Sequence, residues 1–270
     1  MVASDKAFVG SIPELYDRLL VPLIFEPYAR DLAGLAAAAA PQSILEIAAG
    51  TGVVTRAMAA ALPATTPIIA TDLNQTMLDR AMAQQPGGRK IAWRQADALA
   101  LPFEDKTFDA VVCQFGAMFF PDKVKGYAEA HRVLKPGGRY FFNVWDRIAD
   151  NEFADVVTEA LAEMFPSDPP RFLARTPHGY HDAAQIRTEL QAAGFRDIAI
   201  DAVDHRSRAP SPRDPAVAYC QGTPLSNEIV ARDPARLDEA TQRAADALAR
   251  RFGTGAVDGR IRALVISATR

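Results

Sequence analysis

An α/β fold with a mostly parallel sheet is predicted by three features of the sequence. Seven short apolar runs of strand length recur along the chain, and segments with helical spacing of apolar residues separate them. The run 108–115 is nearly continuous in apolar residues, as a strand covered on both faces should be. A glycine turn after the first run leads directly into a helical pattern, which is typical of βαβ units. We therefore expect a Rossmann-like, seven-stranded sheet with helices on both faces.

The order of the elements follows from these runs and from the residues that end them. Pro41 terminates an alanine-rich helix. The strand candidates are 44–48, 68–71, 91–95, 108–115, 140–145, 197–203 and 260–268. The helix candidates are 53–62, a helix containing Met77, Leu78, Ala81 and Met82, then 127–134, 151–164, 182–193 and helical material from Pro215 to Arg251.

The length of 270 residues suits one elaborated domain. We expect an N-terminal helical lid over 1–40, a cofactor-binding core over 41–145, and over 146–270 the remainder of the sheet with substrate-cap insertions. The insertions, about 146–181 and 207–259, follow the fifth and sixth strands, and their length favours a cap over simple loops. Side chains that could line an apolar pocket there are Phe153, Met164, Phe165, Phe172, Tyr180, Tyr219 and Leu225.

Composition excludes several classes of protein. With 49% hydrophobic and 23% charged residues, the chain falls in the globular class. Its 30 basic and 33 acidic residues leave a net charge of −3 without a long basic run, which argues against nucleic-acid binding. The longest apolar stretch is too short for a membrane span. Two widely separated cysteines, Cys113 and Cys220, and the absence of a signal-peptide pattern predict a cytoplasmic location. No metal site is expected, and nothing specifies an oligomeric state.

The segment 46–52 joins the first strand to the first helix and carries the clearest chemistry. Gly50 and Gly52 would let a ligand approach the backbone, and the helix N-terminus offers free N–H groups. A nucleotide-like ligand is the general expectation at such a crevice. A dinucleotide site would have a third glycine where Thr55 stands, and Glu46 suits a cationic amine better than a diphosphate.

Two acidic residues follow the next two strands. Asp72 lies 20 residues after Gly52, the spacing at which a carboxylate accepts from ribose hydroxyls. Asp97, after the third strand, could accept from the exocyclic amine of adenine. Each has a structural alternative, because Asp72 could cap the following helix and Asp97 could close a turn.

Four sequence blocks together resemble the class I S-adenosylmethionine-dependent methyltransferases, specifically the methyltransferase type 11 group that includes the ubiquinone and menaquinone C-methyltransferases. The blocks are 44–52, 71–78, 97–109 and 132–139, and they occur in the order and at the spacing of that family. The resemblance spans 44–145 and weakens outside it, and the C-terminal signature of the quinone enzymes is not evident. Ala48 stands where the family usually has glycine, and we expect it to narrow the site without closing it.

The resemblance implies a role for each matching residue. Glu46 would face the methionine amino group, Asp72 the ribose diol, and Asp97 with Ala98 the adenine. Gln114 and Phe115 would contact the methionine portion, and Tyr16 would close over the cofactor from the lid. The full set of cofactor residues implied is Tyr16, Glu46, Ala48, Ala49, Gly50, Thr51, Gly52, Asp72, Leu73, Asp97, Ala98, Gln114 and Phe115.

The predicted activity is methyl transfer by in-line displacement from S-adenosylmethionine to a small, hydrophobic or aromatic acceptor, with S-adenosylhomocysteine as product. Positioning can supply about 7 to 11 kcal/mol of the barrier, more than the roughly 3 to 5 kcal/mol of a general base. Tyr180 and His181 are candidate bases within a cluster that also contains His178, although helix capping is the simpler role for this cluster. The alternatives are an NAD-dependent oxidoreductase and a non-catalytic S-adenosylmethionine-binding module.

Overall fold

The computed structural model describes residues 12–270, which form two compact units. The helical unit contains the described residues up to Phe25 together with Trp145–Tyr180 and Asp204–Ala263. The sheet unit contains Glu26–Val144, His181–Val203 and Leu264–Arg270. The described part of the predicted N-terminal lid, 12–40, is divided between the two units at Phe25 and Glu26. Its role as a lid stays a prediction.

A single seven-stranded sheet has the order β3-β2-β1-β4-β5-β7-β6. Its strands are β1 (Ile44–Glu46), β2 (Ile68–Asp72), β3 (Ala92–Gln95), β4 (Phe108–Gln114), β5 (Leu134–Trp145), β6 (Arg196–Ala209) and β7 (Val257–Thr269). β1 pairs in parallel with both β2 and β4, β2 with β3, and β4 with β5. The strand order therefore reverses at β1 and β4, which is where ligands bind in open α/β sheets.

The last two strands depart from the parallel pattern. Backbone hydrogen bonds join Asp146 to Arg262 and Gly137 to Arg270, so β7 runs antiparallel to β5. β6 and β7 are consecutive in the chain and adjacent in the sheet, and they form the antiparallel hairpin of an otherwise parallel sheet. The expected number of strands and their mostly parallel arrangement are confirmed.

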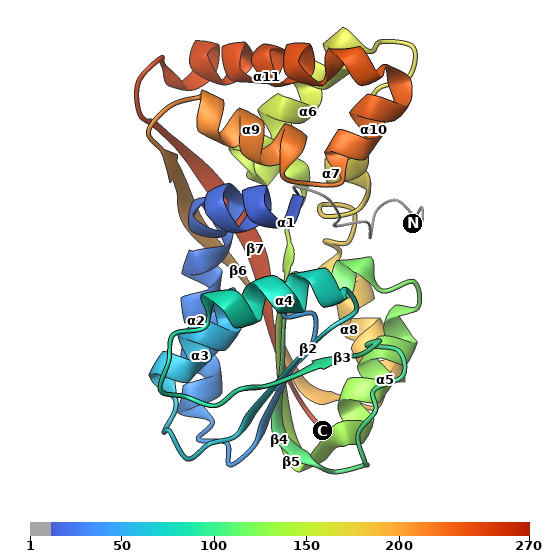
Figure 1. Ribbon diagram of the computed structural model, residues 1–270. Coiled ribbons are helices and arrows are strands. Elements are labelled where there is room, and N and C mark those ends of the chain that lie inside the picture. The colour runs from blue at the N-terminus through green and yellow to red at the C-terminus, as the bar shows by residue number, and fades with distance from the viewer. Residues whose placement is uncertain (1–11) are drawn as a thin grey trace. The chain divides into compact units, whose positions relative to one another are not determined.

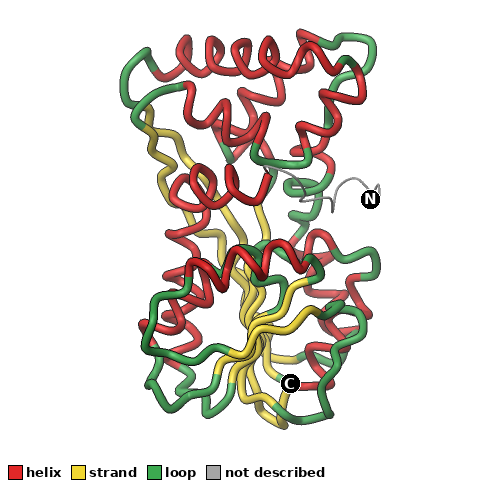
Figure 2. Tube along the Cα trace, in the orientation of Figure 1, coloured by secondary structure: helices red, strands yellow, loops and turns green. Residues whose placement is uncertain are grey.

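Helices cover both sides of the sheet unit (Figure 1). α2 (Glu26–Ala38) and α3 (Val53–Ala61) lie together on one side, and α5 (Lys123–Val133) and α8 (Ala183–Ala192) on the other. α4 (Gln75–Gln84) packs on β2 and β3, and the short η3 (Ala117–Phe119) follows β4. Figure 2 shows the strands gathered into one twisted sheet between these groups of helices.

Burial explains why the central strands read as apolar runs. Ile44 and Leu45 of β1 and Val111 of β4 are fully buried, because helices cover both faces there. β5 begins at Leu134, earlier than the predicted 140, because Leu134 pairs with Phe108 before the register shifts and resumes at Arg139. The sequence had assigned 135–138 to a helix stop, and these residues instead form the start of the strand.

The helical unit is built from amphipathic helices and by itself forms a second core. Its elements are α1 (Ile12–Leu15), the π-helix η2 (Tyr16–Phe25), η4 (Ile148–Asp150), α6 (Glu152–Met164), α7 (Phe172–Arg175), α9 (Arg213–Gln221), α10 (Leu225–Arg232), η5 (Pro234–Arg236) and α11 (Leu237–Phe252). Ala240, Ala244 and Leu248 recur on one face of α11 and are buried. α11 packs against α6 and α9.

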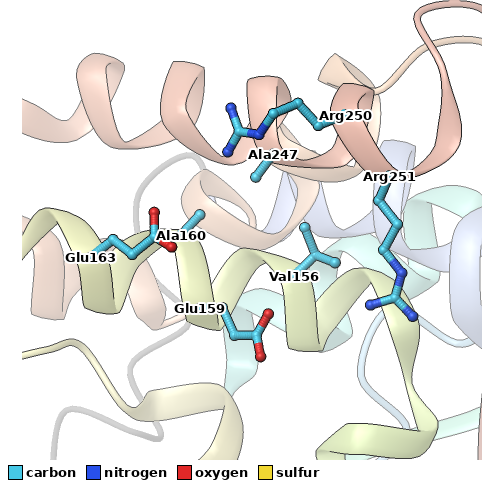
Figure 3. A pocket seen from close by; sticks show the side chains of 7 residues that line it. All are labelled: Val156, Glu159, Ala160, Glu163, Ala247, Arg250 and Arg251. Carbon is cyan, nitrogen blue, oxygen red and sulfur yellow. The ribbon is translucent and has the colours of Figure 1, made fainter.

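A shallow groove separates α6 from α11 on the helical unit (Figure 3). Small apolar side chains form its floor, Glu159 and Glu163 stand on the α6 side, and Arg250 and Arg251 on the α11 side. None of the residues that the sequence predicts for the cofactor lines this groove. No helix among residues 12–270 is both long and apolar enough to cross a membrane.

Candidate cofactor site

The turn after β1 is shaped by residues in the left-handed conformation. Ala48 has φ +56°, Gly50 φ +56° and Gly52 φ +80°. The Ile47 N–H donates to the Val112 carbonyl at 2.8 Å, and the Ala49 N–H donates to the Thr71 carbonyl at 2.9 Å. The turn is therefore fixed to both neighbouring strands of the parallel sheet at its carboxyl edge.

Gly52 is required for packing and for backbone conformation. A Cβ on Gly52 would lie 3.0 Å from Ala81 Cβ and 3.1 Å from the Trp93 ring. The side-chain space is thus filled by α4 and β3, and the expectation that Gly52 lacks a side chain in order to admit a ligand finds no support here. At Gly50, by contrast, a Cβ would meet only Met77 Cε at 3.8 Å, so φ alone favours glycine there.

Thr55 stands at the position of the missing third glycine and has a defined partner. It is fully buried on α3, and its hydroxyl donates to Glu46 Oε2 at 2.5 Å. Glu46 is 1% exposed at the end of β1. Burial raises the pKa of the Glu46 carboxyl from 4.5 to about 8, while the Thr55 hydrogen bond and the charge of Arg56 lower it. A buried carboxyl of this kind can receive a cation by losing its proton.

Asp72 links the turns that follow β1 and β2. Its Oδ2 accepts from the Gly50 N–H at 2.8 Å, and its Oδ1 accepts from the Asn74 N–H at 2.8 Å. Burial raises the pKa of this carboxyl, and the backbone N–H donors oppose that shift. Each carboxylate oxygen keeps a second lone pair, so a ribose hydroxyl can still donate to it. Asp72 does not cap α4 through its side chain in the manner the sequence left open, because the N-cap residue is Asn74.

The residues after β3 form a turn at the surface. Asp97 is exposed, and its Oδ1 accepts from the Leu99 N–H at 2.9 Å, which is the turn geometry that the sequence left open as an alternative. Ala98 lies within this turn and is half-buried. Leu73, after β2, is 43% exposed, and its carbonyl accepts from the Gln95 side chain. These residues stay available to a ligand at the same sheet edge.

Gln114 and Phe115 close β4 next to β5, and both are buried. Phe115 has φ +48°, and its N–H donates to the Oδ1 of Asn143 at 2.9 Å. Sequence reasoning missed Asn143. The one signal for it was a single polar residue inside the apolar run that forms β5.

Tyr16 is the only predicted cofactor residue that belongs to the helical unit. It lies at the start of η2, is half-buried, and stacks on Phe25 with ring centroids 4.9 Å apart. Its closing over the cofactor, and the covering role of the predicted lid and caps, stay predictions. The predicted pocket side chains Phe153, Phe172 and Tyr219 are buried in the core of the unit.

The candidate bases differ in their surroundings. His181 is exposed before α8, whereas Tyr180 is 5% exposed. Asp182 caps α8 by accepting from the N–H groups of Ala184 and Gln185, as the capping alternative predicts. His178 is 5% exposed, and its Nδ1 donates to the Asp146 carbonyl at 2.8 Å, since a carbonyl can only accept. Residues 12–270 contain no group of three or more His, Cys, Asp or Glu side chains that could hold a metal ion.

This fold is the open α/β class in which nucleotide-type ligands bind at the carboxyl edge of a mostly parallel sheet. The model of a methyltransferase domain family matches residues 45–142. A demethylmenaquinone methyltransferase of Deinococcus radiodurans is 38% identical over an alignment of 208 residues, and the match covers 72% of this chain and 85% of the relative. A ubiquinone/menaquinone biosynthesis C-methyltransferase of Escherichia coli is 29% identical over an alignment of 177 residues, and the match covers 58% of this chain and 67% of the relative.

A solved structure of a protein from Bacillus halodurans C-125 has the same fold, with a TM-score of 0.56, 21% identity, and coverage of 88% of this chain and 98% of that chain. The chain belongs to the class I S-adenosylmethionine-dependent methyltransferases. It is an enzyme of methyl transfer, and its cofactor is S-adenosylmethionine. Membership of this family argues against both alternatives, the NAD-dependent oxidoreductase and the non-catalytic S-adenosylmethionine-binding module.

Proposed function

We propose that the chain methylates a small hydrophobic or aromatic acceptor of the hydroquinone type. The names of the two quinone methyltransferases among its relatives support this choice. One structural observation supports it further, an aromatic row inside the helical unit formed by Tyr16, Phe25, Trp145 and His178. Ring centroids are 4.9 Å apart for Tyr16 and Phe25, 6.0 Å for Phe25 and Trp145, and 5.9 Å for Trp145 and His178.

The row runs from the buried His178 to the half-buried Tyr16. Trp145, which lies between Phe25 and His178 in the row, is the last residue of β5. In this proposal the half-buried Tyr16 ring stacks on an aromatic acceptor, and the buried rings behind it keep water away from that contact. A protein or nucleic acid acceptor would instead need an open charged surface.

S-adenosylmethionine, when bound, supplies an electrophilic methyl group on a sulfonium. In this proposal the Asp72 carboxylate orients the ribose, the Glu46 carboxyl receives the positive charge of the amino acid end, and the backbone of 48–52 holds the remainder. The chain's own contribution is then alignment and exclusion of water, and alignment is the larger part of the barrier reduction. Tyr180 and His181 stay predictions as bases.

The acceptor is tested by incubating the protein with S-adenosylmethionine and a panel of a naphthalene hydroquinone, a primary amine and a carboxylic acid, with products identified by mass spectrometry. We expect the hydroquinone to be methylated. Phe25→Leu should raise its KM about tenfold by removing one ring contact from the row. Phe153→Leu is the matched control, because Phe153 is also buried in the same unit but packs on Phe252. Methylation of the amine or the acid alone would contradict the proposal.

The role of Asp72 in the cofactor site has its own test. Asp72→Ala removes two backbone contacts as well as the contact to ribose, so it should lower both stability and affinity. Asp72→Asn keeps an acceptor oxygen, and we expect it to retain the fold while S-adenosylhomocysteine binding weakens about 10- to 100-fold. Calorimetry that shows unchanged affinity in a folded Asp72→Asn protein would remove Asp72 from the ligand contacts.

A further inference from the structure

Phe115 has a backbone conformation that its side chain disfavours. Its φ of +48° lies in the left-handed region, which bulky residues rarely adopt. The Phe115 ring is 6% exposed and meets the Tyr28 ring edge-on with centroids 5.4 Å apart. Tyr28 is itself fixed, since its hydroxyl donates to the Val203 carbonyl at 2.9 Å. Strained residues of this kind persist only where their surroundings hold them, and they gather at functional sites.

Asn143 supplies the hold on Phe115. It lies opposite Gln114 in the β4–β5 register and is 0% exposed. The Phe115 N–H donates to Asn143 Oδ1 at 2.9 Å and to the Asn143 carbonyl at 3.2 Å. Because an N–H needs an acceptor, Oδ1 and not Nδ2 faces Phe115.

The Nδ2 group of the Asn143 carboxamide, unlike Oδ1, is buried and forms no hydrogen bond with the described residues. An unpaired buried donor destabilises the fold, and an apolar side chain on this strand would avoid that cost. The presence of asparagine here is therefore explained by what Oδ1 does for Phe115.

The conformation of Phe115 determines where Gly116 lies, and Gly116 packs on the glycine turn. A Cβ on Gly116 would lie 2.5 Å from Ala48 Cβ and 2.8 Å from Cys113 Sγ. Ala48 in turn has φ +56° and opens the turn of 48–52. The alanine at 48, where the family usually has glycine, thus fits because residue 116 has no side chain.

We propose that Asn143 is a positioning residue for the cofactor: it holds Phe115 in the left-handed conformation and thereby places Gly116 against Ala48 of the glycine turn. The contact chain runs from β5 through the end of β4 to the turn after β1. This proposal depends on the binding of S-adenosylmethionine, the cofactor of the family, and is independent of the acceptor proposed above.

The test is a double-mutant cycle in which glycine at 115 supplies the left-handed conformation unaided. Asn143→Ala should weaken S-adenosylhomocysteine binding about tenfold in the Phe115 background, the loss expected for one buried hydrogen bond. In the Phe115→Gly background the same change should cost less than about twofold. Binding is measured by calorimetry, and thermal unfolding is recorded for all four proteins.

Asn151→Ala is the matched control. Asn151 is 1% exposed, and its carboxamide hydrogen-bonds to the backbone of Asp146, Arg147 and Arg262 within the helical unit. Its loss should lower the unfolding temperature and leave the affinity for S-adenosylhomocysteine unchanged.

The outcomes separate clearly. If Asn143→Ala alone fails to fold while the double variant folds and binds, the positioning role is supported. Equal losses of affinity in both backgrounds, no loss in the Phe115 background, or failure of both proteins to fold would overturn it. A native chain that does not bind S-adenosylhomocysteine would overturn the cofactor site itself, a result distinct from binding without coupling.

Discussion

Protonation of Glu46 should couple stability and cofactor binding to pH. The carboxyl is buried, accepts from Thr55, and has a pKa raised by burial from 4.5 to about 8. Between these values the unfolded chain ionises Glu46 while the folded chain keeps its proton. Stability from this residue is therefore fully present below about pH 4.5 and is lost as pH rises through about 8. The corresponding free energy is on the order of 5 kcal/mol as an upper bound.

Replacing Glu46 by glutamine removes this titration and keeps an acceptor for the Thr55 hydroxyl. The free energy of unfolding, measured by urea denaturation without cofactor from pH 5 to 8.5, should fall more steeply with pH in the native chain than in Glu46→Gln. The variant should be the more stable of the two at pH 8. Identical slopes would show that Glu46 is already ionised in the folded protein and would refute the reasoning.

Glu129→Gln is a matched control with the opposite sign. The hydrogen bond from Arg132 lowers the pKa of Glu129, so its contribution to stability is present above the ordinary glutamate pKa and is lost as pH falls. Removing it should lower stability at neutral pH and reduce the acid sensitivity of the chain.

Cofactor binding gives a second measure of the Glu46 proton. Because burial raises this pKa to about 8, most of the folded molecules carry the proton at pH 7. A cationic amino group placed beside Glu46 favours the ionised form, so binding should release a proton. Calorimetry in buffers of different ionisation enthalpy should detect this release in the native chain and not in Glu46→Gln.

Two glycines give further predictions. Gly116→Ala should abolish S-adenosylhomocysteine binding or unfold the sheet unit, because its Cβ would lie 2.5 Å from Ala48 Cβ. Adding Ala48→Gly should restore part of the lost stability in thermal unfolding. If it restores none, Ala48 is not the obstacle. Gly52→Val should lower the unfolding temperature even without ligand, because the side chain meets Ala81 and Trp93 and φ is +80°. An unchanged unfolding temperature for Gly52→Val would contradict the packing role and would favour a role of Gly52 in ligand contact.

The sequence by itself determined the sheet and a nucleotide-type site, and the resemblance of four blocks to the methyltransferase family added the cofactor. Apolar runs at strand length, the glycine turn and the two acids at strand ends are local patterns, and local patterns report backbone period and turn chemistry directly. Predicted strands at 68–71 and 108–115 therefore agree with β2 and β4 within a residue. Strand ends were predicted less well where the pairing partner is distant in sequence. The sequence predicted that the sixth strand ends at 203, whereas β6 extends to Ala209 because β7 lies beside it.

Only the tertiary structure decided what the site residues do for one another. Thr55 reads as a missing glycine in the sequence, and only the fold turns it toward Glu46. In the sequence Asn143 is only a polar residue within an apolar strand. The structure shows that its Oδ1 accepts a hydrogen bond from the Phe115 N–H at the end of β4. The space beside Gly52 is filled by Trp93, 41 positions further along the chain. These contacts join residues far apart in sequence, and no period or spacing encodes them, because they arise from how the strands and helices pack.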